Sequence, residues 1–174
     1  MSKAVMLSIR PKWVEKIVSG EKTIEVRKTK PKLQTPFKCY IYCTLQGCNE
    51  FFRVDLGRDV AKWSRGKWAD RKGKVIGEFT CERIALIAYD GGELSSTTNA
   101  AFSPATCLTQ SEIIAYIGDK GRCYGWHISD LLIYDQPREL SEFTGLRNTR
   151  FGAAPYDIKR PPQSWCYVDD VQAK

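Results

Sequence analysis

One short run holds the charged residues best suited to chemistry. Lys22, Glu25 and Arg27 occur together in Gly20-Glu-Lys-Thr-Ile-Glu-Val-Arg27. Cations in such a run neutralise phosphates, and a carboxylate accepts hydrogen bonds from the amino groups of nucleic-acid bases. The alternative interpretation is an ion pair between Glu25 and Arg27 on a solvated strand face, which would stabilise the fold by at most ~1 kcal/mol.

A strict alternation in this run predicts the strand that positions these side chains. The polar residues Thr23, Glu25 and Arg27 alternate with the apolar residues Ile24 and Val26. Because side chains alternate across a strand, we expect the apolar pair to face the core and the polar set to line a concave pocket. If the site is catalytic, Thr23 joins Lys22 and Glu25 as a candidate.

The segment before this run supplies further candidates. Residues 4–9 read as a buried strand, and the apolar stripe within 11–18 predicts a short amphipathic helix. The strand, the helix and the returning strand bring three more side chains toward the run: Arg10, Lys12 and Trp13. We expect them to form the opposite wall of the pocket, together with a strand over 122–127.

Basic and aromatic residues extend this candidate surface. Lys28 and Lys30 follow the run in a proline-bounded loop and would contact phosphates. Tyr124 and Trp126 share one face of a later strand, where either ring could stack on a base or pack in the core. The one histidine, His127, is expected to be packed or hydrogen-bonded in that strand rather than to act as a general base.

The remaining patterns predict the fold class. Strands are expected over 38–43, 74–88, 122–134 and 164–168, a loop over 90–106, and a helix over 110–117 that begins with a capping box of Thr109 and Glu112. About six strands with two or three short helices indicate a mixed α+β domain, a small β-barrel flanked by helices. We expect one domain over 1–174, elaborated at 46–72 and extended after 135.

Composition bounds the class of protein. The chain has 174 residues, 43% hydrophobic and 27% charged, so it can bury a core and is not globally disordered. No apolar run approaches the ~20 residues that a membrane helix needs, and no signal peptide is evident. We therefore predict a cytoplasmic protein that does not contact membranes. No Walker, GxGxxG, HExxH or GxSxG motif occurs, which excludes the enzyme classes that those motifs mark.

Charge is distributed unevenly along the chain. Residues 1–74 contain 18 Lys and Arg against 7 Asp and Glu, a net charge of +11, whereas residues 75–174 contain 9 against 13, a net charge of −4. A basic half indicates a polyanionic partner, although solvated surface lysines are the plain alternative. Trp63 and Trp68 lie among basic residues and would suit single-stranded nucleic acid if exposed, or would anchor the 46–72 elaboration if buried.

Seven cysteines are present, without a CxxC pair. The odd count argues for reduced thiols rather than disulfides. Cys39, Cys43 and Cys48, or Cys123 with His127, have a loose metal-like spacing, but we expect ordinary core thiols. Neither a metal nor a cofactor is predicted.

Several segments resemble the ASCH family of PUA-like domains. They are Leu7-Ser-Ile-Arg-Pro11, Gly20–Arg27, Gly73-Lys-Val-Ile-Gly77-Glu-Phe and Tyr124-Gly-Trp-His-Ile-Ser-Asp130. The Gly-x-Lys-x-x-Glu-x-Arg element is the most specific of them. The resemblance implies a β-barrel with helices beside it, a cleft lined by that element, and RNA or nucleotides as partners.

The same family resemblance also implies an enzymatic alternative. Some small members resemble amidohydrolases that act on acetylcytidine, and others are reported as ribonucleases. The family's lysine and arginine match Lys22 and Arg27, whereas Glu25 stands where the amidohydrolases have a Thr nucleophile. A carboxylate replaces that nucleophile only with a change of mechanism.

We therefore predict an RNA- or nucleotide-binding domain with a basic cleft around the GxKxxExR element. Lys22 acts there as an electrostatic ligand, because neighbouring Glu25 favours its charged form. The alternatives are a small hydrolase that uses Lys22 and Glu25, and a protein-interaction module that leaves the cleft unused. The oligomeric state stays open.

Overall fold

The computed structural model describes residues 2–45, 71–90, 93–96 and 102–170. The chain divides into two compact units. The terminal unit comprises Met1–Glu15, Lys38–Glu78 and Leu132–Lys174, and the central unit comprises Lys16–Phe37 and Phe79–Leu131. The assignment of all 174 residues to one domain stays a prediction.

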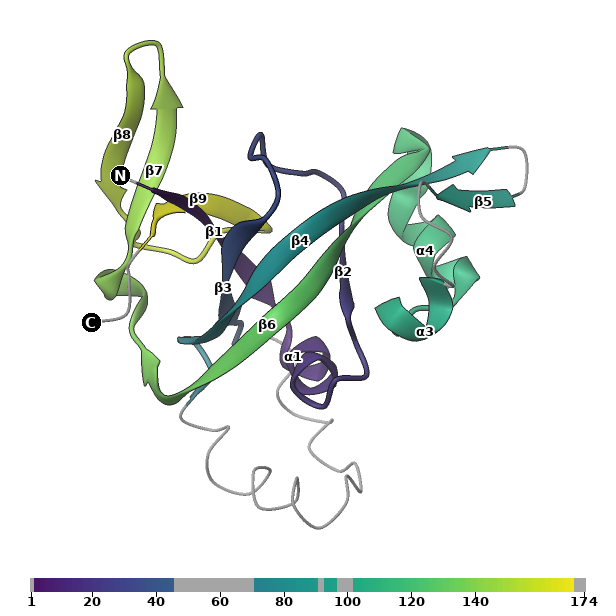
Figure 1. Ribbon diagram of the computed structural model, residues 1–174, viewed down its shortest axis with the longest axis horizontal. Helices are drawn as coiled ribbons and strands as arrows, with labels where there is room; N and C mark the ends of the chain where they lie inside the picture. Colours follow the sequence, from purple (N-terminus) through teal and green to yellow (C-terminus); the bar gives the residue numbers. More distant parts are fainter. Residues whose placement is uncertain (1, 46–70, 91–92, 97–101, 171–174) are drawn as a thin grey trace. The chain divides into compact units, whose positions relative to one another are not determined.

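The terminal unit is a sheet with strands from both ends of the chain. Its strands are β1 (Lys3–Ile9), β3 (Phe37–Cys43), the start of β4 (Val75–Asp90), the end of β6 (Arg122–Arg138), β7 (Thr144–Thr149), β8 (Gly152–Asp157) and β9 (Trp165–Asp169). Their order is β6-β4-β3-β1-β9-β7-β8. β1 is parallel to β3 and antiparallel to β9 (Figure 1). A short 3-10 helix, η3 (Leu140–Glu142), precedes β7.

Continuous apolar segments explain why β1 and β3 lie inside this sheet. Nearly every residue of both strands is buried, as expected for strands covered on both faces. The core around them includes Met6, Tyr40 and Phe143. β4 and β6 approach closely at Gly77, where a Cβ would collide with the backbone of Leu132. Glycine is therefore needed at that position.

The central unit carries the candidate run. Its strands are β2 (Ile24–Arg27), the start of β6, the remainder of β4 and β5 (Glu93–Ser96), in the order β2-β6-β4-β5. Its helices are α3 (Phe102–Thr106), α4 (Gln110–Ile117) and the 3-10 helix η2 (Gly118–Lys120), and α1 (Pro11–Val18) is divided between the units. β2 pairs antiparallel with β6, so that Arg27 lies opposite Tyr124. Strand β2 is thereby fixed along one edge.

Helix α4 covers the sheet of the central unit. Its N-terminus has the predicted capping box, in which Thr109 and Glu112 satisfy each other's backbone N–H groups. Ile113 and Ile117 on its buried face pack with Val26 of β2 and with residues of β4 and β6. The helix thereby holds β2 from its apolar side.

The mixed α+β class is confirmed, with short helices beside a dominant sheet. The described residues form nine strands rather than about six, and these strands are not closed into a barrel. The expected loop over 90–106 contains β5 and α3, and the extension after 135 folds into a β7–β8 hairpin. Both segments lack the alternation of apolar and polar residues on which strand prediction depends.

The cysteines in the described residues are free thiols. Cys39, Cys43, Cys81 and Cys123 are fully buried in strands. Burial raises the pKa of Cys81 to about 12 and that of Cys123 to about 11. Within the described chain, no helix is long and apolar enough to cross a membrane.

Candidate nucleic-acid interface

The charged residues of the candidate run form a buried ion-pair cluster. Lys22, Glu25 and Arg27 are only 3%, 5% and 8% exposed. Glu25 Oε1 lies 3.0 Å from the Arg27 guanidinium, and Glu25 Oε2 lies 3.3 Å from Lys22 Nζ. The interpretation of a solvated surface ion pair is therefore wrong, because both faces of β2 are covered.

The Lys22 ammonium makes two hydrogen bonds to backbone carbonyls and one ion pair. It donates to the carbonyl oxygens of Ile24 at 2.9 Å and Thr106 at 2.8 Å, and it faces the Glu25 carboxylate. Thr106 ends α3, and the adjacent Ala105 carbonyl accepts a hydrogen bond from the Thr23 backbone N–H. The end of α3 therefore positions both the start of β2 and the side chain of Lys22.

Glu25 carries the negative charge for two cations, so the three side chains together have one net positive charge. Its Oε2 atom is buried and makes no hydrogen bond with the described residues, although it lies within ion-pair distance of Lys22. Buried charges are costly unless they are paired. The excess positive charge favours an anion near this cluster.

Tyr116 of α4 also belongs to this neighbourhood and was missed by the sequence analysis. Burial raises the pKa of its hydroxyl; the positive charge of Arg27 opposes that shift and the negative charge of Glu25 adds to it. The carbonyl of Thr106 was missed as well. Neither residue has a local sequence signal, because Thr106 lies 84 residues beyond Lys22 and Tyr116 lies on the helix after it.

Exposed lysines beyond β2 lie over aromatic rings. Lys28 Nζ is 5.2 Å from the Tyr116 ring centroid, and Lys30 Nζ is 5.6 Å from that of Tyr124. Both lysines are exposed, and Tyr124 is partly exposed directly opposite Arg27 in the β2–β6 pair. A groove of about 430 Å³ follows, lined by Lys30, Pro31, Leu33, Gln34, Thr35 and Ile84. Cationic and aromatic groups thus alternate beside the cluster.

Trp126 does not share this exposure. It is fully buried and packs edge-on against Phe37, with ring centroids 5.8 Å apart. Its proposed role in stacking on a base is therefore corrected: Trp126 is a core residue, and Tyr124 is the exposed aromatic candidate of this strand. Thr23, the further catalytic candidate, is exposed at the entry to β2.

The candidates that precede the run lie in the terminal unit. Arg10 and Lys12 are exposed and Trp13 is partly exposed, with Lys12 Nζ 4.4 Å from the Trp13 ring centroid. The Arg10 carbonyl accepts the first backbone hydrogen bonds of α1. Their role as the opposite wall of a pocket stays a prediction.

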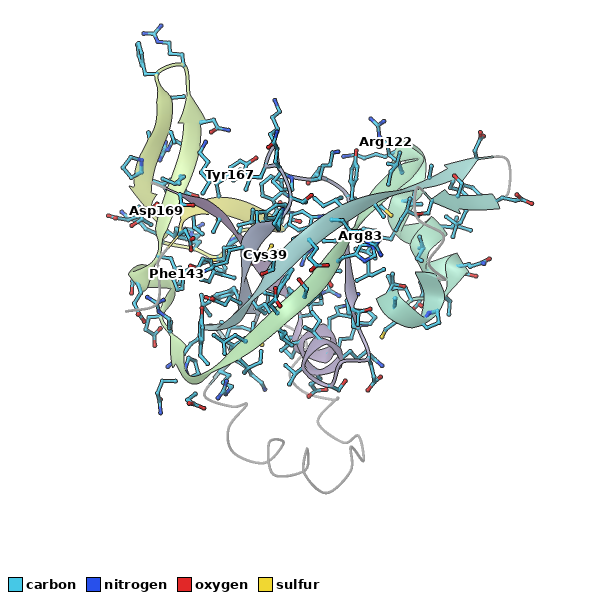
Figure 2. The ribbon with its side chains drawn as sticks, viewed as in Figure 1. Cys39, Arg83, Arg122, Phe143, Tyr167 and Asp169 are labelled. Atoms are coloured by element: carbon cyan, nitrogen blue, oxygen red, sulfur yellow. The ribbon has the colours of Figure 1, made fainter. Side chains whose placement is uncertain are left out.

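His127 is partly buried in β6. Its Nε2 atom is buried and makes no hydrogen bond with the described residues. Burial lowers the pKa of His127, the positive charge of Arg83 lowers it further, and Glu82 acts in the opposite direction. Figure 2 labels Arg83 on β4. A neutral, packed imidazole fits the expectation for this residue.

Two remaining predictions concern the 46–72 elaboration and metals. Trp63 and Trp68 lie outside the described residues. Arg71 of the same basic segment is buried, and its guanidinium donates to the backbone carbonyls of Tyr134 and Asp135. Across the described ranges, no cluster of three or more His, Cys, Asp or Glu side chains is placed to hold a metal ion.

Comparisons with known proteins concern the family and the fold of this chain. Residues 7–76 match the family model of the ASCH domain. The structure is similar to that of ASCH from Zymomonas mobilis, with a TM-score of 0.52, 18% identity, and coverage of 95% of this chain and 87% of that chain. It is also similar to a tyrosine-to-phenylalanine variant of the Zymomonas mobilis protein, with a TM-score of 0.53, 18% identity, and coverage of 97% and 91%.

No curated protein sequence matches the chain. At 18% identity, the likeness to the solved structures concerns the fold. The sequence motifs, the family model over residues 7–76 and this shared fold together confirm that the chain resembles the ASCH family.

Proposed function

We propose that this chain is an RNA- or nucleotide-binding domain whose interface surrounds the Lys22–Glu25–Arg27 cluster. The observation that carries the proposal is the row of exposed lysines over aromatic rings beside that cluster. Lys28 with Tyr116 and Lys30 with Tyr124 combine a cation for a phosphate with a ring for a base. The net positive charge of the cluster supports an anionic ligand.

The buried and exposed residues have different roles in this proposal. Lys22 and Glu25 hold Arg27 and the end of β2 in position, and they supply a fixed electrostatic field. Lys28 and Lys30 contact phosphates, and Tyr124 stacks on a base. The neighbouring groove extends this surface along the loop that contains Lys30.

The geometry around Lys22 favours binding over hydrolysis. A general base needs an available lone pair, whereas this ammonium donates to two backbone carbonyls and forms an ion pair with the Glu25 carboxylate. Thr23 is exposed, but the buried Lys22 ammonium is turned toward Glu25 and Thr106. Hydrolysis and protein interaction are therefore the two alternative results that the following experiment would detect.

The proposal is tested by the anisotropy of a labelled single-stranded RNA over a range of salt concentrations. Affinity falls as salt rises, and the double variant Lys28→Gln/Lys30→Gln makes the slope shallower by roughly 1.4, because each phosphate contact contributes about 0.7 for single strands. Tyr124→Ala weakens binding by at least about 5-fold through lost stacking. Lys120→Gln, at an exposed lysine of η2, is the control for the loss of one positive charge elsewhere and leaves the slope unchanged.

Three results would contradict the proposal. Equal effects of the Lys120 and the Lys28/Lys30 substitutions would show that binding reflects net charge alone. Turnover of acetylcytidine or RNA by the wild type would favour the hydrolase. Absence of binding at micromolar protein would favour the protein-interaction module.

A further inference from the structure

The β7–β8 hairpin of the terminal unit extends away from its core. Gly145 and Leu146 are buried where β7 pairs with β9, whereas residues 147–153 are all exposed. Figure 1 shows the hairpin continuing beyond β9, the strand on which it is anchored. We call residues 144–157 the hairpin arm. Both faces of its outer part are open to solvent.

A hydrogen-bonded turn presents two side chains at the end of the arm. Thr149 pairs with Gly152, which leaves Arg150 and Phe151 as the two turn residues. The Thr149 hydroxyl donates to the Gly152 carbonyl at 2.8 Å and accepts from the Phe151 backbone N–H at 3.2 Å. Phe151 is 84% exposed, and the Arg150 guanidinium lies 4.5 Å from its ring centroid. The cation and the ring therefore face solvent together.

A second cation–aromatic pair lies nearer the base of the arm. The Arg147 guanidinium is 4.9 Å from the ring centroid of Tyr156, its diagonal neighbour on the paired strand. Residues 147–154 contain two arginines and no acidic residue. The outer arm is thus locally basic, although residues 75–174 as a whole are net acidic. This charge favours a polyanionic partner.

The free edge of the arm is unsuited to another β-strand. β8 is the last strand of the order in this unit, and it carries the exposed Pro155, which has no N–H to donate. Addition of a strand from a second copy would lack that hydrogen bond. The exposed side chains at the tip are therefore better candidates for contact than the strand edge.

We propose that the hairpin arm is a second contact for single-stranded RNA, in which Phe151 stacks on an unpaired base and Arg150 and Arg147 neutralise the flanking phosphates. Exposed aromatic rings bind unstacked bases, and arginines beside them bind the backbone. The turn held by Thr149 lowers the entropy lost on binding, because the tip is already ordered. This proposal depends on the proposed function only for the class of ligand, single-stranded RNA. The residues of the arm lie in the terminal unit, whereas those of the proposed function lie in the central unit.

The test measures the anisotropy of a labelled single-stranded RNA of about 20 nucleotides, long enough to span the site of one binding domain. Phe151→Ala weakens binding by at least about 5-fold, Phe151→Trp restores it, and Phe151→Leu does not, because leucine keeps hydrophobic surface without a ring to stack. Arg150→Gln reduces the salt slope by about 0.7. Arg160→Gln, at an exposed arginine beyond the arm and outside the candidate interface, is the matched control and leaves affinity unchanged.

The outcomes separate the arm from the proposed function. Loss of affinity in the arm variants, with none in the Lys28/Lys30 and Tyr124 variants, supports the arm and contradicts the proposed function. The reverse result overturns the arm proposal, and so does an absence of RNA binding by the wild type. Two further results would show that the tip is a hydrophobic protein contact and that the proposal is wrong. One is that Phe151→Leu binds RNA as well as the wild type. The other is that Phe151→Ala only converts a dimer into a monomer in sedimentation.

Discussion

Glu25 pairs with two cations at once, through one oxygen with Arg27 and through the other with Lys22. Removing one member of such a buried set leaves charges that neither water nor another side chain fully compensates. Under the proposed function, this cluster couples ligand binding to folding, because the groups that create the field also close the end of β2. At the scale of single residues, the stability of this cluster is the first property to measure.

We predict that Glu25→Gln lowers the free energy of unfolding by about 3–5 kcal/mol, because it leaves Lys22 and Arg27 buried without their shared carboxylate. Urea denaturation measures the change. The control is Glu21→Gln, which removes an exposed ion pair with Lys16 and should cost at most about 1 kcal/mol. Equal losses in the two variants would contradict the description of the cluster as buried.

A second prediction at this scale concerns the single histidine. Burial and Arg83 lower the pKa of His127, so its proton resonance in NMR should titrate below pH 6.5. Arg83→Gln raises that midpoint by removing the cation, and Glu82→Gln lowers it by removing the opposing carboxylate. A midpoint at or above 6.5 would show that the imidazole is solvated.

The same shift gives a sign for the dependence of stability on pH. Because the unfolded chain binds this proton more readily than the folded chain, the contribution of His127 is fully present above pH 6.5 and is lost as pH falls from 6.5 toward the lower folded pKa. Urea midpoints should therefore decrease over that interval. In His127→Gln, this part of the pH dependence should disappear.

At the scale of elements, the hairpin arm depends on a glycine beneath an aromatic ring. The Tyr156 ring occupies the space where a side chain at position 145 would stand. This contact anchors β8 on β7 at the base of the arm, where the pair Gly145–Tyr156 belongs to the strand register. The arm is therefore tied to the core by packing rather than by an alternating apolar face.

We predict that Gly145→Ala destabilises the protein by about 1–3 kcal/mol, since the added methyl group displaces the Tyr156 ring. Thermal or urea unfolding measures the loss. In the Tyr156→Ala background the same substitution should cost much less, because the steric conflict has been removed. An equal cost in both backgrounds would mean that the glycine is needed for another reason.

At the scale of the whole molecule, the strands predicted from sequence were those with continuous or alternating apolar residues. β1, β2, β3 and β9 agree with the expected ranges within one or two residues, and α4 begins and ends as its cap predicts. Local periodicity and capping are properties of short segments, so one sequence is enough to identify them. The expected strands and short helices indicated the mixed α+β class, and the resemblance to the ASCH family agreed with it.

Other features depend on contacts that no local pattern contains. The acceptor for Lys22 on Thr106 is 84 residues away, so the burial of the cluster could not be predicted from the alternation in β2. Tyr124 and Trp126 share one face of the same strand, yet packing against Phe37 makes Trp126 a core residue. The outer part of the arm has both faces exposed, so its sequence lacks the alternation of apolar and polar residues by which a strand is recognised.

The buried cysteines have a consequence for the reactivity of the folded chain. A thiol reacts with an alkylating reagent as its thiolate. Cys81 and Cys123 are fully buried, and their raised pKa values keep both thiols protonated at neutral pH. Their alkylation must therefore wait for the strands to separate. We predict that mass spectrometry of the native protein shows Cys107, which is partly exposed, modified well before these two. The rate at which Cys81 and Cys123 are labelled then measures how often the fold opens transiently, without the use of a denaturant.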